Sequence, residues 1–154
     1  MVLDRHLDGP GAALWRAANL WQRRQREALA RHRLTPVQFL LLAGLAELAG
    51  SGPVTQVALA RLCGADPMMV SQVVRDLEKM RLVRRASHPG DQRARALALT
   101  GEGRRMFDRV APAMIEVQHE VFGVLAGDVE AFTGALGLLG GAKPRRRVAA
   151  GHRE

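Results

Sequence analysis

Apolar residues recur every three to four positions through most of the chain, a spacing that predicts amphipathic helices. This pattern covers residues 12–32, 55–63, 66–80, 101–125 and 129–139. Residues 36–48 are apolar on almost every side, which predicts a central buried helix. The period falls to two over residues 82–88 and again over 94–100, with turn residues at 89–91 between them. We therefore expect a β-hairpin after the fourth helix.

Residues that favour helix starts support these boundaries. Thr35 is followed by Pro36 and, three residues after the cap, by Gln38, which predicts a capping box with proline in the first turn. Asp66 followed by Pro67 repeats the pattern of a cap and a proline. The helices at 55–63 and 66–80 are short and are joined by a tight connection that contains glycine, which is typical of a helix-turn-helix motif.

These elements indicate a mainly α fold with a small β-hairpin wing, an α+β arrangement built around a helix-turn-helix. The chain has 154 residues, enough for one hydrophobic core and too few for two ordinary domains. We expect a single domain over residues 1–142. Residues 143–154 are rich in arginine and predict a disordered basic tail.

The charge distribution points to a nucleic-acid partner. The formal net charge is +8, and most of the basic residues are arginines, whose planar fork suits phosphates and guanine edges. Residues 54–100 carry eight Arg or Lys against four Asp or Glu, whereas residues 101–142 carry three against six. This asymmetry predicts a DNA-facing module beside a scaffold that does not touch DNA. From charge alone, a solvated basic face is the alternative.

Other classes of protein find little support. No apolar run reaches the roughly 18 residues that a membrane-spanning helix needs, and the N-terminus lacks the apolar core of a secretory signal. We expect a cytoplasmic protein with no membrane partner. Cys63 is the only cysteine, and the five histidines show no ligand spacing, so we expect no disulfide, metal or cofactor. We interpret Cys63 as a small buried hydrophobic residue, with an oxidation sensor as the alternative.

A helical wheel divides the helix at 66–80 into two faces. Val70, Val73, Val74 and Leu77 form the predicted core face. The opposite face carries polar and flexible side chains, namely Met68, Gln72, Arg75 and Lys79, flanked by Ser71 and Asp76. Glutamine can pair with adenine, arginine with guanine, and methionine can contact a thymine methyl. The alternative is an ordinary polar surface helix.

The hairpin is the second predicted contact element. It concentrates four arginines around one turn, at positions Arg84, Arg85, Arg93 and Arg95. A basic tip of this kind can enter a minor groove. Asp91 can hold Arg93 in place through a salt bridge, although an isolated surface pair of this type contributes little.

Four segments resemble the MarR (multiple-antibiotic-resistance regulator) family of winged helix-turn-helix regulators. They are Leu34 to Phe39, Thr55 to Ala60, Met69 to Glu78, and Asp91 to Gly103, the last reading Asp-x-Arg-x-Arg into Leu-Thr-x-x-Gly. The resemblance implies a homodimer formed by helices at 12–33 and 101–140, with a DNA-binding lobe at 34–100. The sequence departs from the family pattern at Arg81, because members of the family usually have glycine in the turn after the recognition helix, which is the helix at 66–80 here.

The resemblance also implies the partners and the site. Two lobes related by a twofold axis are expected to bind a pseudo-palindromic operator in double-stranded DNA. With the residues argued above, the predicted DNA-binding set is Thr55, Gln56, Pro67, Met68, Met69, Ser71, Gln72, Arg75, Lys79, Arg84, Arg85, Asp91, Arg93 and Arg95.

Many members of the family release DNA when a small, often aromatic or phenolic, compound binds between the dimerisation helices and the lobe. Trp15, Trp21 and Phe39 are weak candidates for such a pocket, and core or interface positions are the alternative for each. We predict a sequence-specific transcriptional regulator, more specifically a repressor released by such a ligand. A winged-helix module that binds protein or coats DNA without sequence preference is the alternative.

We predict no enzymatic activity. Residues 100–103, Thr-Gly-Glu-Gly, follow a strand and open a helix, but they lack the spacing of a phosphate-binding P-loop. No Ser-His-Asp or Cys-His set is evident. A helix start is the better interpretation of this segment.

Overall fold

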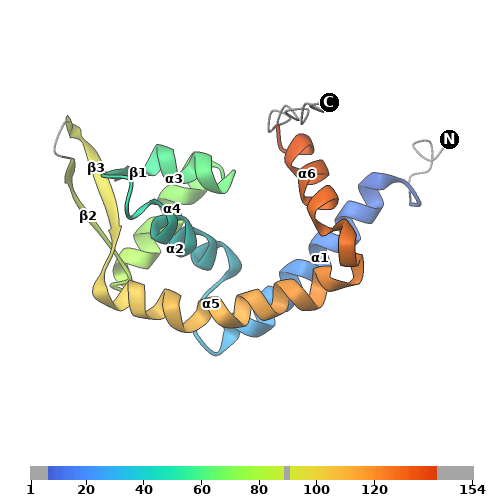
Figure 1. Cartoon of the computed structure of the whole chain (residues 1–154). Coiled ribbons are helices and arrows are strands. Elements are labelled where there is room, and N and C mark those ends of the chain that lie inside the picture. Colours follow the sequence, from blue (N-terminus) through green and yellow to red (C-terminus); the bar gives the residue numbers. More distant parts are fainter. Residues whose placement is uncertain (1–6, 89–90, 142–154) are drawn as a thin grey trace, which may run out of the picture. The chain divides into compact units, whose positions relative to one another are not determined.

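The structure, a computed structural model, describes residues 7–88 and 91–141, and the side chains of residues 87–95 are outside this description. The chain forms two compact units, residues 1–121 and 122–154, and each is described by itself. The elements, labelled in Figure 1, are α1 (Pro10–Ala30), α2 (Pro36–Leu48), β1 (Val54–Thr55), α3 (Gln56–Cys63), α4 (Pro67–Lys79), β2 (Val83–His88), β3 (Asp91–Leu99), α5 (Gly101–Phe122), η2 (Gly123–Asp128) and α6 (Val129–Leu139).

The predicted fold class is confirmed, because the described residues form helices and one small antiparallel sheet. The sheet has the strand order β1-β3-β2. The predicted hairpin is present, and it pairs Val83 of β2 with Leu99 of β3. The third strand was not predicted. It pairs Val54 with Leu97, and it is only two residues long, too short to show a period.

Side-chain caps fix the starts of three helices. The capping box predicted for α2 is present, with the Gln38 backbone N–H donating to Thr35 Oγ1 (3.2 Å) and the Thr35 N–H donating to Gln38 Oε1 (2.9 Å). At the start of α3, Thr55 Oγ1 accepts from the Ala58 N–H at 3.1 Å, and at the start of α4 the Asp66 carboxylate accepts from the Met69 N–H at 2.9 Å. Each cap typically stabilises its helix by about 1 kcal/mol.

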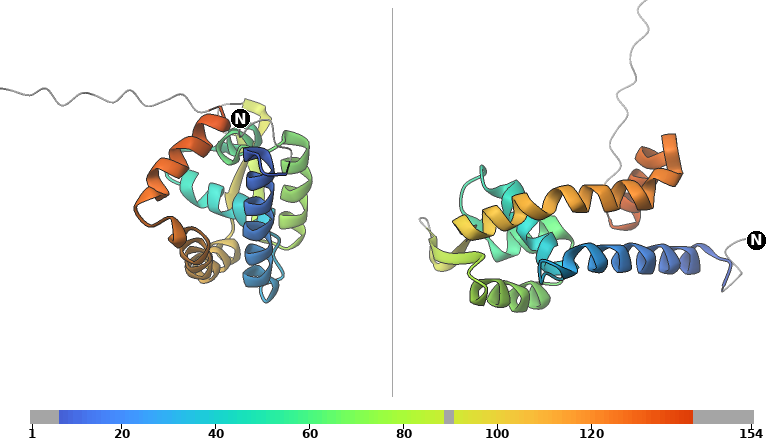
Figure 2. Two further views of the ribbon diagram at one scale, coloured as in Figure 1. Left: turned by 90° about the vertical axis from the view of Figure 1, so that its right-hand side faces the viewer. Right: turned by 90° about the horizontal axis from the view of Figure 1, so that it is seen from below.

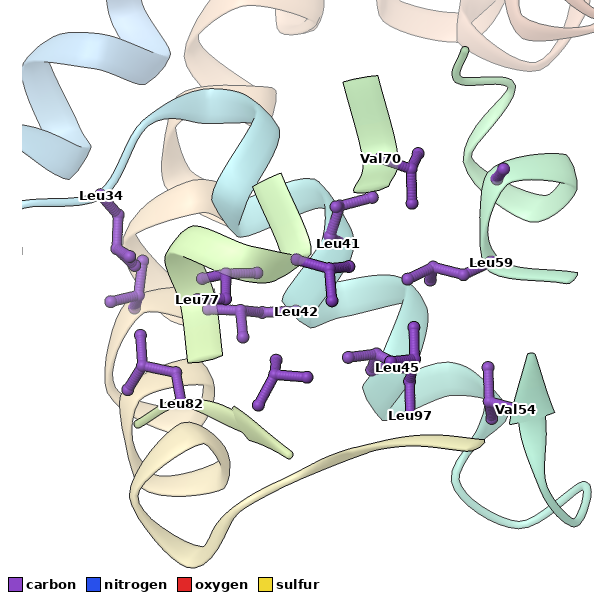
Figure 3. Packing of buried hydrophobic residues seen from close by; sticks show 14 of the residues in the cluster. Leu34, Leu41, Leu42, Leu45, Val54, Leu59, Val70, Leu77, Leu82 and Leu97 are labelled. Atoms are coloured by element: carbon purple, nitrogen blue, oxygen red, sulfur yellow. The ribbon is translucent and has the colours of Figure 1, made fainter. Parts of the chain in front are cut away.

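Unit 1 has a continuous hydrophobic core to which α2, α3, α4 and the sheet of the lobe contribute, together with residues of α1 and α5. Leu41, Leu42 and Leu45 of α2 lie at its centre, as predicted for this helix, and meet side chains from α3, α4 and the sheet (Figure 3). The fully buried set includes Leu59, Val70, Val74, Leu77 and Leu82. Burying each such side chain contributes about 1.5–3 kcal/mol. This core fixes α4 against α2 and so determines which side of α4 faces solvent.

Two of these helices approach unusually closely. A β carbon on Gly44 of α2 would lie 2.8 Å from Leu59 Cδ1 and 2.9 Å from Cys63 Sγ on α3. The absence of a side chain at Gly44 therefore lets the two helices cross at short range. Cys63 is half-buried at this crossing, and burial raises the pKa of its thiol.

The turn from α4 into β2 is held by the start of α5. Arg81 has a φ of 61°, the left-handed conformation for which glycine is favoured. The Thr100 hydroxyl donates to the Arg81 carbonyl oxygen at 2.6 Å and accepts from the Gly103 N–H at 2.9 Å. The Leu-Thr-x-x-Gly segment thus joins the end of the sheet, the first turn of α5 and the turn after α4.

Beyond the lobe, α1 and α5 extend to the same side of it (Figure 2). Arg24 of α1 and Glu120 of α5 form an ion pair at 3.3 Å. The helix α1 exposes large apolar side chains, including Leu14 and Trp15, of which Trp15 is 71% exposed.

Unit 2 consists of η2 and α6. Phe122 and Phe132 pack with their ring centroids 6.1 Å apart. Val124, Leu138 and Leu139 are exposed, at 85%, 55% and 78%.

One stretch of the chain contains a long apolar window. By length and composition, the helical residues Gly101–Leu139 include an 18-residue window that could cross a membrane. Ala126 interrupts this stretch, because its φ of 46° and ψ of −117° are not helical. The window is interrupted by charged residues and is not an unbroken apolar run. The predicted boundary between two helices near this position is confirmed.

Candidate nucleic-acid interface

The helix α4 has one buried and one exposed face, oriented as the helical wheel predicted. Val70, Val74 and Leu77 are completely buried, and Val73 is half-buried beside them. On the opposite side Met68 is 80% exposed, and Gln72, Arg75 and Lys79 are also exposed. The described structure therefore presents a row of hydrogen-bonding side chains to solvent on a helix whose position is fixed by the core.

These exposed side chains are linked to one another along the helix. Arg75 Nη2 donates to Gln72 Oε1 at 2.8 Å, and Gln72 Nε2 lies 3.5 Å from the Asp76 carboxylate. Lys79 Nζ pairs with the same carboxylate at 3.4 Å. The network orients the Gln72 amide, with its oxygen toward Arg75 and its nitrogen toward Asp76. Sequence reasoning gave Asp76 no role beyond flanking this face, although an acid one turn from two polar residues is a detectable signal.

The remaining α3 and α4 positions of the predicted set have varied surroundings. Thr55 is half-buried and uses its hydroxyl as the cap of α3. Gln56 is also half-buried, and its Nε2 donates to the Pro67 carbonyl oxygen at 3.5 Å, which ties α3 to the start of α4. Pro67 is exposed, whereas Met69 and Ser71 are half-buried. The Gln56–Pro67 contact places the start of α3 beside the start of α4.

The two described wing arginines differ from each other. Arg84 on β2 is exposed to solvent. Arg85 is instead paired with Glu78 of α4, with Nε and Oε2 2.9 Å apart, and its side chain is only 29% exposed. Sequence reasoning grouped both with the DNA contacts, and it missed the pairing because the six residues between Glu78 and Arg85 include the turn at Arg81.

The other predicted wing residues fall in the hairpin tip. The backbone of β3 includes them, with Ser87 opposite Arg95 and His88 opposite Asp91. The side chains of Asp91, Arg93 and Arg95, and the predicted Asp91–Arg93 pair, lie outside the described residues.

The three aromatic candidates for a ligand pocket separate in the structure. Phe39 packs in the core, stacked on Phe107 with ring centroids 5.9 Å apart, and Trp15 is exposed on α1. Trp21 lies in a groove of about 510 Å³ between α1 and the first turn of α2. The groove is lined by Trp21, Gln22, Gln25, Arg26, Thr35, Pro36, Val37 and Leu40. It combines an indole ring, apolar side chains, amides and one guanidinium group.

A basic cluster lies where α1 ends. Arg31 Nε contacts His32 Nε2 at 3.1 Å. Burial and the positive charges of Arg31 and Arg109 lower the pKa of His32 below its usual value. Among residues 7–88 and 91–141, no three His, Cys, Asp or Glu side chains gather into a group that could hold a metal ion.

The sequence of this chain is similar to those of known transcriptional regulators. The model of the MarR family matches residues 32–94, which span α2, the helix-turn-helix and most of the hairpin. Over 114 residues the chain is 39% identical to the uncharacterised HTH-type transcriptional regulator YdcH of Bacillus subtilis, covering 73% of this chain and 78% of that protein.

Solved structures show the same architecture. A probable transcriptional regulator from Pseudomonas aeruginosa superposes with a TM-score of 0.77 at 28% identity, covering 88% of this chain and 99% of that one. The transcriptional repressor CouR of Rhodococcus jostii, bound to a 23-mer DNA duplex, gives a TM-score of 0.73 at 26% identity, covering 84% and 91%.

Proposed function

Because this chain belongs to the MarR family of DNA-binding transcriptional regulators, we propose that it is a homodimeric repressor which a small ligand releases from its operator. The observation that carries the proposal is the exposed face of α4, where Gln72, Arg75 and Lys79 stand on a helix fixed by three fully buried residues. Related CouR is a repressor bound to duplex DNA, which supports the same role here.

In the proposed complex α4 lies in the major groove. Gln72 would pair with adenine, Arg75 with guanine, and Met68 would contact a thymine methyl, each polar pair giving about 1–3 kcal/mol of discrimination. The intrahelical network must open for this, since Arg75 and Gln72 bond each other in the free protein. Arg84 and the wing residues Arg93 and Arg95 would contact the backbone or minor groove, with Asp91 supporting Arg93.

The exposed apolar residues support a homodimer. Leu14 and Trp15 on α1, and Leu138 and Leu139 on α6, are large side chains that water would otherwise surround. Exposure of such large apolar side chains to water is unfavourable, and a second copy of the chain would cover them. Two lobes related by a twofold axis would then contact half-sites about 10–10.5 base pairs apart.

The groove beside Trp21 supports ligand control. Its volume of about 510 Å³ lies in the range of small-molecule sites. An indole face, apolar walls and the Arg26 guanidinium suit a small aromatic compound that carries an acidic or phenolic oxygen. CouR also binds an aromatic acyl compound, p-coumaroyl-CoA. A ligand would act by favouring a dimer whose lobe spacing does not match successive grooves.

Residues 1–142 would form one regulatory domain that acts in the cytoplasm. The basic tail at 143–154 would add DNA affinity that does not depend on sequence. The proposal assigns the chain no catalytic step. The competing function is a winged-helix module that coats DNA without reading sequence. An acidic residue on the exposed face of α4, Asp76, disfavours that function, because it weakens attraction to phosphates without excluding base contacts.

A gel-shift comparison tests the proposal. The full-length protein is titrated against DNA from upstream of its own gene and against shuffled DNA of the same length and composition, at fixed salt. A sequence-specific repressor should bind its operator about 10³-fold or more tightly than the shuffled fragment. Equal affinity for the two would favour the coating function.

A further inference from the structure

We propose that Glu78 and Arg85 form a positioning pair that fixes the wing relative to α4, and that Arg85 therefore does not serve as a direct DNA contact. The inference rests on the proposed use of α4 and the wing in DNA binding. It concerns Glu78 and Arg85, which are not among the side chains proposed above to contact DNA. Both belong to unit 1, within the described part of the chain.

The pair is placed where two DNA-facing elements diverge. Glu78 lies in the last turn of α4, and Arg85 is the third residue of β2. Their Oε2 and Nε atoms are 2.9 Å apart, and the side chains are 30% and 29% exposed. Among the ion pairs of the described residues, this one is the least exposed and the one that joins α4 to the wing. Reduced exposure strengthens such a contact relative to an ordinary surface pair.

Backbone hydrogen bonds hold the wing at two places, the turn after α4 and the pairing of β3 with β1 at Leu97 and Ala96. At the turn, the Leu82 N–H donates to the Leu77 carbonyl at 2.9 Å, and Thr100 holds the Arg81 carbonyl. From there β2 continues to His88, and a strand rises about 3.3 Å per residue, so a small rotation at the base is amplified at the tip. The Glu78–Arg85 contact lies beyond the turn, where it can oppose that rotation.

The charges also argue for a structural role. An unpaired carboxylate at the end of the DNA-facing helix would repel phosphates, and an unpaired arginine would attract them. Joined at 2.9 Å, the two largely cancel, so the pair adds little to the field that draws the protein to DNA. The neighbouring Arg84 is exposed and so remains available to phosphates. This contrast between Arg84 and Arg85 also supports a structural role for Arg85.

The test compares full-length variants that separate positioning from phosphate contact. Glu78→Gln, Arg85→Gln, the double variant and the exchange Glu78→Arg with Arg85→Glu are titrated against an operator fragment selected by the wild-type protein and against shuffled DNA. Titrations at several salt concentrations give the slope of log affinity against log salt. Arg84→Gln is the matched control, because a lost phosphate contact lowers this slope by about one.

We expect Glu78→Gln to weaken operator binding about tenfold, although it removes a negative charge, and to leave binding to shuffled DNA unchanged or tighter. Arg85→Gln should give a similar loss with an unchanged salt slope. The double variant should be no weaker than either single variant, and the charge exchange should restore most of the affinity.

Three results would overturn the inference. Operator binding by Glu78→Gln could equal or exceed that of the wild type. Arg85→Gln could lower the salt slope as Arg84→Gln does. The two single losses could multiply in the double variant, as independent contacts would.

A measurement without DNA distinguishes failure of the inference from failure of the proposed function. Amide hydrogen exchange over residues 83–99 should be faster in Glu78→Gln and Arg85→Gln than in Arg84→Gln, with thermal unfolding confirming that each variant is folded. Unchanged exchange would refute the positioning role. A wild-type protein that does not prefer its operator would instead refute the proposed function, whatever the exchange rates are.

Discussion

Gly103 of α5 lies directly against the backbone of Leu82, so closely that a β carbon on Gly103 would overlap the Leu82 carbonyl oxygen. Leu82 follows the turn that ends α4, and the same carbonyl accepts the Thr100 N–H at 3.0 Å. The glycine of the Leu-Thr-x-x-Gly segment is therefore required by a close approach between α5 and the turn that connects the DNA-facing helix to the wing.

Gly103→Ala should destabilise the protein because backbone cannot move aside as a flexible side chain can. We expect a loss of about 1–3 kcal/mol in the free energy of unfolding, measured by urea denaturation. Gly101→Ala is the control, since the nearest atom to a β carbon at this position is the end of the flexible Arg105 side chain, 3.5 Å away. Equal stability of the two variants would contradict the packing argument.

Arg81→Gly should stabilise the turn after α4. Arg81 has a φ of 61°, and a left-handed conformation costs a residue with a β carbon about 1–2 kcal/mol. The gain should be smaller than this cost because glycine also increases the entropy of the unfolded chain. Arg81→Ala removes the same side chain but keeps the β carbon, so only the glycine variant should raise the melting temperature.

Gln72→Ala should change the preference of the protein at one base pair of its operator. Gln72 is exposed on the face of α4 opposite the buried Val70 and Val74, and a bidentate contact to adenine discriminates by about 1–3 kcal/mol. In vitro selection of binding sites measures the change, with Glu47→Ala, an exposed position on α2, as the control. An identical selected motif for Gln72→Ala and the wild type would show that α4 is oriented differently on DNA.

Introducing a charge into α6 should weaken the proposed dimer. Leu139 is 78% exposed, and Leu139→Glu would bring a carboxylate into an interface that buries this side chain. Analytical ultracentrifugation should find the wild type near twice its 16.8 kDa chain mass and the variant shifted toward the monomer. Val57→Glu, at a 64% exposed site on α3, should remain dimeric. A monomeric wild type would contradict the proposal.

His32 should titrate below its ordinary range. Burial together with Arg31 and Arg109 lowers its pKa from 6.5, so the folded state binds this proton less readily than the unfolded state does. Protonation of His32 therefore costs the folded state more than the unfolded state, so stability falls as the pH drops from about 6.5 through the folded pKa. An NMR titration of the His32 ring should show the low value, and Arg109→Gln should raise it. A value at or above 6.5 would contradict the assignment.

The helical elements were predictable because their signals are local. The spacing of apolar residues gave α4 its buried and exposed faces, and Asp66 followed by Pro67 marked its start, which the Met69–Asp66 hydrogen bond confirms. The starts and ends of α2, α3, α5 and α6 lie within a few residues of their predicted positions. Periodicity of 3.6 needs only neighbours on the same helix, so no tertiary information is required.

The features that sequence reasoning missed all depend on residues meeting across a turn or between elements. The strand β1 is defined only by its partner, because Val54 and Thr55 are too few to carry an alternating pattern. Arg85 belongs to a dense arginine pattern that indicated DNA contact, yet it pairs with Glu78. The groove beside Trp21 requires the packing of α1 against α2, which apolar spacing along each helix does not specify.

What the sequence alone determined, then, is the identity and order of the helices and the hairpin, the polar face of α4 and the resemblance to a DNA-binding family. The tertiary structure decided which charged groups are available to a partner. The reason is the turn at Arg81, whose left-handed backbone is common for glycine but not signalled by arginine. That conformation brings β2 back beside α4, and only then can Glu78 hold Arg85 while Arg84 stays exposed.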